Sequence, residues 1–412
     1  MKIAVVDQKV NKGGLSRVIK KLLPEISKSN SISITYFGNR EGINRENLHK
    51  TFEKNNIKIN FLQSLNFSSD NLNNKIFFKL IKYLQNKYLK KLNFLPYWLN
   101  GNLEKELNYK LKDFDLIYFP WPFLIEFPMI NKPIVATFHD FNFKYYFSGN
   151  STYSNNNTIK LNRQMNTWVK NSEIIVSNNF TKSELIKFYP NNAERVNVIP
   201  LSYYSKKENS DKVKFNQISK KYNLPANYIY CGTNNCAHKN LNPLFAALNI
   251  LKSKNIYLNL VLTGNGTEII NGISCEYGVE LKNDDKDVIG LGYIDDEELD
   301  EIIKNADILI SPEMYTSDNG PATDGWINGI PTILANIPSN IEHIETQSVH
   351  AELFDYRNPK DIAEKIKFVL ENQEKFRTLA QKSKKEISKM SWTTVAEKYT
   401  SVFKQAYEEK NK

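Results

Sequence analysis

The sequence predicts an α/β protein built from two doubly wound domains, each a parallel sheet wrapped by helices. Short apolar segments alternate with helical patterns in both halves of the 412-residue chain. Between the halves, residues 205–221 are polar and rich in lysine, a composition shift that marks a linker or a domain boundary. Residues 308–338 read as strand, loop, helix and strand, which is the parallel βαβ unit.

The first half contains runs of apolar and β-branched residues typical of buried strands. We expect strands at residues 2–7, 31–37, 116–119, 134–138, 174–176 and 196–201. A helix is expected over residues 15–26, because apolar residues recur there at helical spacing, and a second helix begins near Thr181.

The second half restarts the same alternation after the polar segment. We expect strands at residues 228–230, 258–263, 287–291, 308–310 and 332–334. Helical spacing of apolar residues predicts helices at 241–251, 297–305, about 322–328, most of 360–387, and 392–407. Gly329 and Pro331 end the helix at 322–328.

Composition bounds the class of protein. Hydrophobic residues are 41% and charged residues 24% of the chain, as in globular proteins. The sequence predicts no membrane span, and residues 1–10 show no signal-peptide pattern. The three cysteines, Cys231, Cys236 and Cys275, lack C-x-x-C spacing, which favours a reducing compartment. We therefore expect a cytoplasmic protein.

The net charge of +10 favours an anionic partner. No zinc pattern or RNA-binding aromatic signature supports nucleic acid, so we expect none. Residues 74–100 interleave lysines with apolar and aromatic residues, and Tyr97 and Trp98 lie near their end. A basic amphipathic helix at 77–98 fits adsorption to an anionic membrane surface. An ordinary core-facing helix with a solvated lysine face fits at least as well.

Candidate ligand-binding residues follow the strands, where ligands bind in parallel sheets. Gly13 and Gly14 precede a helix and suit either a phosphate cradle or a plain tight turn. His139 ends a strand and fits either a cleft residue or one satisfied by local hydrogen bonds, with Asp140 capping the next turn. Gly264 ends another strand.

The loop after residues 308–310 carries Asp318, Asn319, Gly320 and Asp324 into a helix start. A helix N-terminus presents free N–H groups and suits an anionic ligand such as a diphosphate. The alternative is a surface loop that only caps the helix.

The order of these segments resembles the family 4 glycosyltransferases, also called glycosyltransferase group 1. The resemblance covers nearly the whole chain through KGGLSRVI, TFHDF, SNNFTKSEL, VNVIPLS, CGTNNCAHKNL, LVLTGNG, VIGLGYIDDEEL, NADILISP and NGPATDGWINGIPTI. It implies the GT-B architecture, with two Rossmann-like domains facing a cleft. The implied domains are an acceptor-side domain at 1–203, a nucleotide-sugar-binding domain at 204–388, and a helix at 389–412 that packs back on the first domain.

The resemblance implies the roles of particular residues. Gly14 matches the glycine loop near the donor phosphate, His139 the cleft histidine near the donor sugar, and Lys239 the lysine that neutralises the diphosphate. Thr233 stands where the family often has an arginine, as in members that read GT at this point. The implied catalytic residues are His139, Lys239 and Asp318. The implied donor-binding residues are Gly13, Gly14, Thr233, Gly264, Tyr293, Asn319, Gly320 and Asp324.

The acidic pair departs from the family pattern. Most members carry two glutamates with seven residues between them. The second matches Asp324, which suits the ribose hydroxyls, and the first falls on Thr316, which carries no charge. Asp318 or Glu313 is a candidate substitute.

The resemblance implies retaining transfer of a sugar from a nucleotide-diphosphate sugar to an acceptor hydroxyl, without a cofactor or a metal. The implied acceptor is a glycan or lipid-linked glycan in bacterial polysaccharide or lipopolysaccharide assembly. Two alternatives remain: a degenerate GT-B binding or partner subunit, which the Thr316 departure favours, and a nucleotide-sugar 2-epimerase.

Overall fold

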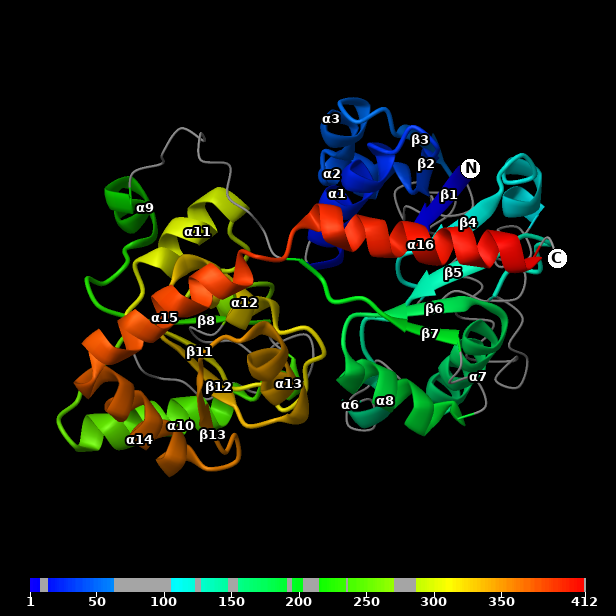
Figure 1. Cartoon of the computed structure of the whole chain (residues 1–412). Coiled ribbons are helices and arrows are strands. Elements are labelled where there is room, and N and C mark those ends of the chain that lie inside the picture. The colour runs from blue at the N-terminus through cyan, green and yellow to red at the C-terminus, as the bar shows by residue number, and fades with distance from the viewer. Residues whose placement is uncertain are drawn as a thin grey trace, which may run out of the picture.

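The computed structural model describes residues 1–7, 14–62, 105–122, 127–146, 155–190, 195–202, 215–234, 236–269 and 287–410. These residues form two α/β domains that lie side by side (Figure 1). The prediction of two parallel-sheet domains is confirmed. The predictions for Gly13, for the segment 77–98 and for most of the linker lie outside the described residues.

The N-terminal domain is organised around a parallel sheet with the strand order β3-β2-β1-β4-β5-β6-β7. Its strands are β1 (Lys2–Asp7), β2 (Ser33–Gly38), β3 (Lys58–Phe61), β4 (Leu116–Phe119), β5 (Ile134–Thr137), β6 (Glu173–Val176) and β7 (Val196–Val198). Its helices are α1 (Gly14–Ser27), α2 (Arg40–Arg45), α3 (Leu48–Glu53), α6 (Phe143–Tyr146), α7 (Asn155–Asn171) and α8 (Asn179–Phe188).

The C-terminal domain repeats this plan with the strand order β10-β9-β8-β11-β12-β13. Its strands are β8 (Ile229–Gly232), β9 (Leu260–Thr263), β10 (Val288–Gly290), β11 (Ile308–Ser311), β12 (Thr332–Ala335) and β13 (Glu352–Phe354). Its helices are α9 (Phe215–Tyr222), η3 (Ala237–Lys239), α10 (Leu241–Ser253), η4 (Thr267–Ile269), α11 (Asp296–Lys304), α12 (Gly320–Asn328), α13 (Pro338–Gln347), α14 (Pro359–Glu371) and α15 (Gln373–Ile387).

Burial explains why the strands read as continuous apolar runs. In β1, Ile3 and Val5 belong to one hydrophobic cluster, whereas Ala4 and Val6 belong to another on the opposite face. Because successive side chains of a strand alternate between faces, a sheet covered on both sides needs an apolar residue at every position. The strand order reverses between β1 and β4, and again between β8 and β11. Such switch points open a crevice at the carboxyl ends of the strands.

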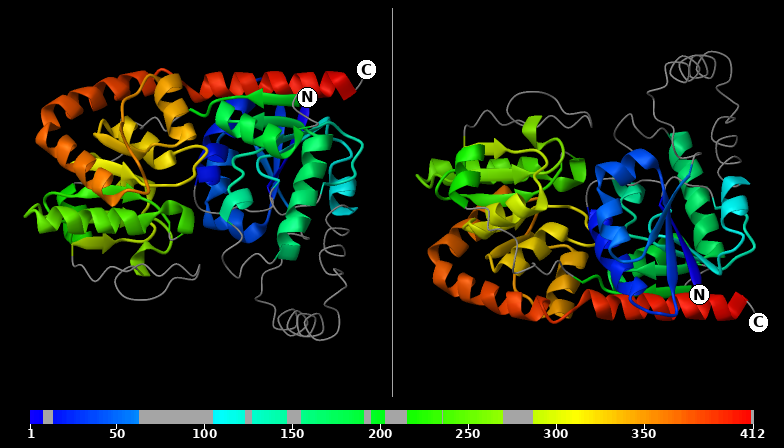
Figure 2. Two further views of the ribbon diagram at one scale, coloured as in Figure 1. Left: turned by 90° about the horizontal axis from the view of Figure 1, so that it is seen from below. Right: turned by 90° about the horizontal axis from the view of Figure 1, so that it is seen from above.

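The last helix, α16 (Trp392–Lys410), packs on the N-terminal domain although it follows the C-terminal domain in the chain. It leaves the C-terminal domain and lies along the N-terminal one (Figure 2). Tyr399 and Phe403 are buried in the same cluster as Ile3 and α1. The Tyr399 hydroxyl also lies 3.4 Å from Thr137 Oγ1 at the end of β5. Within the described residues, no helix combines the length and the apolar character needed to cross a bilayer.

The polar segment 205–221 was predicted to be a linker or a domain boundary. Its last residues form α9, the first described helix of the C-terminal domain. Ile218 is buried there, and Phe215 and Tyr222 pack partly against the same cluster. These three apolar positions fall on one helical face, and they outweigh the lysine-rich composition.

Candidate active site

A cavity of about 420 Å³ lies between the two domains, at the carboxyl ends of both sheets. This volume lies within the usual range for small-molecule sites. The N-terminal wall includes Gly14, Arg17, Trp121 and His139, and the C-terminal wall includes Lys239, Glu313, Thr316, Asp318, Gly320 and Asp324. The cavity therefore combines cationic, acidic and aromatic groups from elements far apart in the sequence.

The structure brings six of the sequence-predicted residues together around this cavity: Gly14, His139, Lys239, Asp318, Gly320 and Asp324. Thr233, Gly264, Tyr293 and Asn319 lie elsewhere in the described part of the C-terminal domain. Arg17 and Trp121 had no role predicted from sequence. Arg17 follows Gly14 by three residues on α1, so helical spacing alone places both on one face.

Lys239 ends η3, and its Nζ lies 2.7 Å from Glu313 Oε2. Glu313 follows β11 and is 2% exposed, and its Oε1 accepts a hydrogen bond from Ser311 Oγ at 3.1 Å. The end of η3 and the end of β11 therefore set the position of this ion pair. The buried carboxylate fixes the direction of the ammonium, which reduces the reorganisation required when an anion binds.

Asp324 is bound across the domain interface by Arg17. Arg17 Nη1 lies 3.5 Å from Asp324 Oδ2, and Arg17 Nη2 lies 2.6 Å from Asp296 Oδ1 at the start of α11. Burial raises the pKa of Asp324 to about 6, although the Arg17 charge opposes this shift. Asp324 was predicted in the loop-to-helix turn. The structure places it one turn inside α12 instead, because this helix already begins at Gly320 with Pro321 in its first turn.

The N-terminus of α12 also differs from the prediction of free N–H donors. The Gly320 amide donates to Asp318 O at 2.8 Å, and the Ala322 amide donates to Asn319 Oδ1 at 3.0 Å. Thr323 N donates to Asn319 O, and Pro321 has no N–H. The helix dipole still faces the cavity, but its first amides are already used.

Asn319 is fully buried, so its side chain acts within the protein. Its Nδ2 donates to Ser311 Oγ at 3.2 Å and to Asn340 Oδ1 at 3.0 Å. Asn319 therefore ties the start of α12 to β11 and α13.

His139 follows β5, and its Nε2 lies 3.0 Å from the carbonyl oxygen of Pro120. Because a carbonyl only accepts, Nε2 carries the hydrogen and Nδ1 is left as an acceptor. Burial lowers the pKa of His139, despite the nearby Asp318 and Asp140 carboxylates. The ring packs against Trp121 with centroids 5.5 Å apart. The cavity thus contains a neutral imidazole in a fixed orientation.

The predicted site glycines differ in whether the surrounding structure leaves room for a Cβ atom. At Gly14 and Gly320 an added Cβ would meet no heavy atom within 4 Å, so packing does not require these glycines. At Gly264, with φ of +123°, a Cβ would lie 1.7 Å from Thr233 O. Gly264 therefore allows the ends of β8 and β9 to approach each other. Tyr293 follows β10 and is 46% exposed. It interacts electrostatically with the Arg17 guanidinium.

Two parallel-sheet domains with a cavity at their facing carboxyl edges are the GT-B architecture, and solved structures support this assignment. The Anabaena protein Alr3699/HepE, solved with UDP and glucose, superimposes with a TM-score of 0.66 at 14% identity, over 98% of this chain and 100% of that one. Sucrose-phosphate synthase of Thermosynechococcus elongatus gives a TM-score of 0.68 at 14% identity, over 99% and 100% of the two chains. WaaG, a glycosyltransferase involved in lipopolysaccharide biosynthesis, gives 0.65 at 12% identity, over 97% and 99%.

Sequence comparison gives a family match for the C-terminal domain. Residues 214–386 match the family model described as Glycosyl transferases group 1. An uncharacterised glycosyltransferase of Methanocaldococcus jannaschii, MJ1607, is 24% identical over 160 residues. That alignment covers 39% of this chain and 40% of the relative, so it spans less than half the length of either protein.

Proposed function

We propose that this protein is a retaining glycosyltransferase of family 4 that transfers a sugar from a nucleoside-diphosphate sugar to an acceptor hydroxyl. The observation that carries the proposal is the interdomain cavity, where Lys239 and Asp324 of the C-terminal domain line the wall together with Gly14 and Gly320. A diphosphate requires a cation, and a ribose diol requires a carboxylate acceptor. The two glycines leave room for a ligand to approach the backbone closely.

We assign the chemistry of each group from the family resemblance, and the position of each group in the cavity is compatible with it. As the anomeric C–O bond to the diphosphate breaks, negative charge grows on the leaving oxygen, and the Lys239 ammonium stabilises it. The acceptor hydroxyl forms the new C–O bond on the same face of the sugar, and its proton passes to the leaving phosphate. His139 offers Nδ1 as an acceptor to a donor-sugar hydroxyl, and Asp318 takes the place of the acid missing at Thr316.

A UDP-sugar is our first candidate for the donor, because Alr3699/HepE was solved with UDP and glucose and with UDP-glucose. The test is a thermal-shift panel of UDP-, GDP-, CDP- and dTDP-sugars. A ligand at about a hundred times its dissociation constant should stabilise the protein by about 2.7 kcal/mol. NMR of the product formed from the best donor should then show the donor's anomeric configuration retained. An inverted anomer would contradict the retaining mechanism.

We further propose that the acceptor is a glycan or lipid-linked glycan of the bacterial cell surface, and that the protein works in the cytoplasm, at or near the membrane. The likeness to WaaG supports this choice. The lysine-rich segment 77–98 would provide the attraction to anionic lipid. The protein should co-sediment with vesicles containing phosphatidylglycerol at low salt and be released by high salt. No binding at low salt would remove the membrane role.

A second candidate, a GT-B protein that binds nucleotide without transfer, is favoured by two contacts. Lys239 is already neutralised by Glu313, and Asp324 already contacts Arg17. This protein would bind UDP yet release no UDP from any UDP-sugar. A nucleotide-sugar 2-epimerase would instead release UDP and free sugar, or an epimerised sugar, without an acceptor, so product analysis with and without acceptor separates the three.

A further inference from the structure

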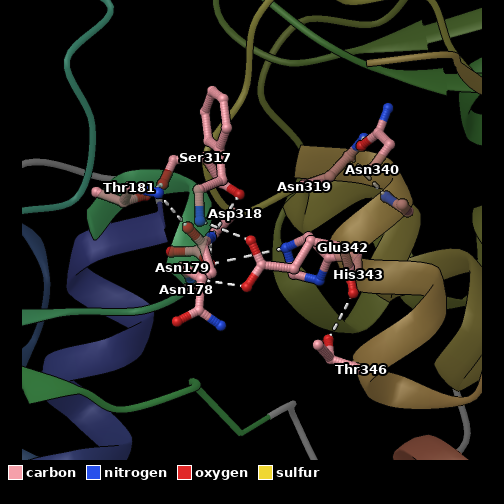
Figure 3. A network of polar contacts seen from close by, with 12 residues as sticks. Asn178, Asn179, Thr181, Ser317, Asp318, Asn319, Asn340, Glu342, His343 and Thr346 are labelled. Atoms are coloured by element: carbon pink, nitrogen blue, oxygen red, sulfur yellow. Dashed lines mark hydrogen bonds and ion pairs between the residues drawn. The ribbon is translucent and has the colours of Figure 1, made fainter. Parts of the chain in front are cut away.

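A buried polar contact joins the two domains next to the cavity (Figure 3). Asn178 lies between β6 and α8 of the N-terminal domain and is 7% exposed. Its Nδ2 donates to Ser317 O at 2.9 Å and lies 3.4 Å from Asp318 Oδ1, both in the loop that follows β11. The carboxylate assigned above to the sugar is therefore contacted from the opposite domain.

The orientation of the Asn178 amide is fixed by the helix that it caps. Asn178 Oδ1 accepts a hydrogen bond from the Thr181 amide at 2.7 Å. A backbone N–H only donates, so the oxygen must face α8 and the nitrogen must face the loop. Asn178 consequently presents only hydrogens to Ser317 and Asp318.

Three neighbouring contacts hold the same interface. The hydroxyls of Thr181 and Ser317 are hydrogen-bonded to each other and buried. The Glu342 carboxylate on α13 accepts from the amides of Asn179 and Phe180, at 2.7 and 2.6 Å. Two residues before Ser317 in the same loop, the Tyr315 hydroxyl accepts a hydrogen bond from the Phe141 amide at 2.9 Å. The segment 315–318 is thus held by the N-terminal domain at several points.

The C-terminal domain holds the Asp318 carboxylate less firmly. In that domain, His343 Nε2 lies 3.8 Å from Asp318 Oδ1, beyond hydrogen-bonding distance. The Asp318 side chain is 27% exposed at the cavity. When the domains separate, this carboxylate would lose its Asn178 donor.

We propose that Asn178 is a positioning residue, which holds the Asp318 carboxylate in the cavity only while the two domains are closed on each other. This inference rests on the proposed function for the role of Asp318. It couples domain closure to donor handling, because the same amide bridges the domains and orients the acid. UDP binding itself uses Lys239 and Asp324, which do not contact Asn178.

The test is Asn178→Asp, compared with Asn358→Asp. Aspartate caps helices as well as asparagine does, so both variants keep their caps. At 178, however, the new carboxylate faces the Ser317 carbonyl and the Asp318 carboxylate and repels both. Asn358 is an exposed cap of α14, where Oδ1 accepts from the Lys360 amide at 3.1 Å, far from the cavity.

We expect Asn178→Asp to lower kcat by about tenfold or more, since a buried acceptor left without its donor is costly. Its Kd for UDP by calorimetry should stay within about twofold of wild type, because Lys239 and Asp324, the charged groups assigned to the nucleotide, both lie in the C-terminal domain. Small-angle X-ray scattering of the UDP-bound protein should give a larger radius of gyration for Asn178→Asp. Asn358→Asp should match wild type in all three measurements.

Wild-type kcat or a wild-type radius in Asn178→Asp would overturn the proposal. So would a loss of UDP affinity as large as the loss in kcat, because it would indicate a collapsed donor site. The scattering comparison is independent of activity. If wild-type protein transferred no sugar at all, the proposed function would fail, and the radius would still decide whether Asn178 holds the domains together.

Discussion

Arg17 of the N-terminal domain and Asp324 of the C-terminal domain meet across the cleft, with Nη1 and Oδ2 3.5 Å apart. The same guanidinium binds Asp296 at 2.6 Å. The proposed ribose acid is thus electrostatically coupled to the opposite domain before any ligand is bound. Burial raises the pKa of Asp324, and Arg17 limits how far it rises.

The first prediction concerns pH. The carboxyl of Asp324 has a pKa of about 6, so it is ionised above this pH and protonated below it. UDP-sugar affinity should be full above pH 7 and fall as the pH drops through 6, because a protonated carboxyl is a weaker acceptor for the ribose diol. Calorimetry between pH 5 and 8 measures this. A UDP-sugar is used because its doubly esterified diphosphate does not titrate in this range.

Asp324→Asn should lower UDP-sugar affinity as protonation of Asp324 does. We expect weaker UDP-sugar binding at pH 7.5, by roughly 1.5–3 kcal/mol, because a charged acceptor is replaced by a neutral amide. The affinity of this variant should no longer change between pH 7 and 5. Binding as tight as wild type would remove Asp324 from the ribose site.

Arg17→Gln should move the pH dependence. Removing the cation takes away the main attraction that lowers the Asp324 pKa. The midpoint of UDP-sugar affinity should therefore shift above 6, and affinity at pH 7 should decrease. Lys28→Gln is the control, since it removes the same charge from the exposed residue that follows α1 and pairs with Glu25. Equal midpoints in wild type and Arg17→Gln would contradict the coupling.

The Lys239–Glu313 pair separates stability from catalysis. Lys239→Met leaves the buried Glu313 carboxylate without its cation. Breaking a buried pair in this way costs about 3–5 kcal/mol of folding stability. Lys239→Met/Glu313→Gln should recover most of that loss in urea unfolding. Turnover should stay low in both variants if Lys239 stabilises the leaving diphosphate. The activation free energy should then be roughly 3–4 kcal/mol higher than in wild type. A double variant with wild-type turnover would place the phosphate site elsewhere.

The last prediction compares two substitutions in the altered acidic pair, at Asp318 and at Thr316. Asp318→Asn should reduce turnover of the full donor more than Thr316→Ala does, because Asp318 brings a charge to the cavity and Thr316 does not. Both should bind bare UDP like wild type, since neither position is assigned to the nucleotide. Steady-state kinetics and calorimetry together measure this difference. Wild-type turnover in Asp318→Asn would end the substitution hypothesis.

Secondary structure followed the sequence where apolar spacing was strong. The strand predicted at 116–119 is β4, and the helix predicted at 15–26 is α1 with one extra residue at each end. The strands β3 and β13 were missed. The β3 sequence, KINF, alternates polar and apolar residues at the edge of its sheet, and four such residues are too few for a periodic signal. The helix α13 was also missed, because its apolar positions are sparse.

The sequence by itself determined most of the strands and helices along the chain, the two-sheet architecture, and the placement of Lys239, His139 and Asp318 after strands. Only the tertiary structure decided which groups these residues meet. Arg17 and Asp324 are 307 positions apart, and Asn178 and Asp318 are 140 apart. Residue periodicity records local backbone preference and burial, whereas these contacts form only when two separately built sheets face each other at their carboxyl edges.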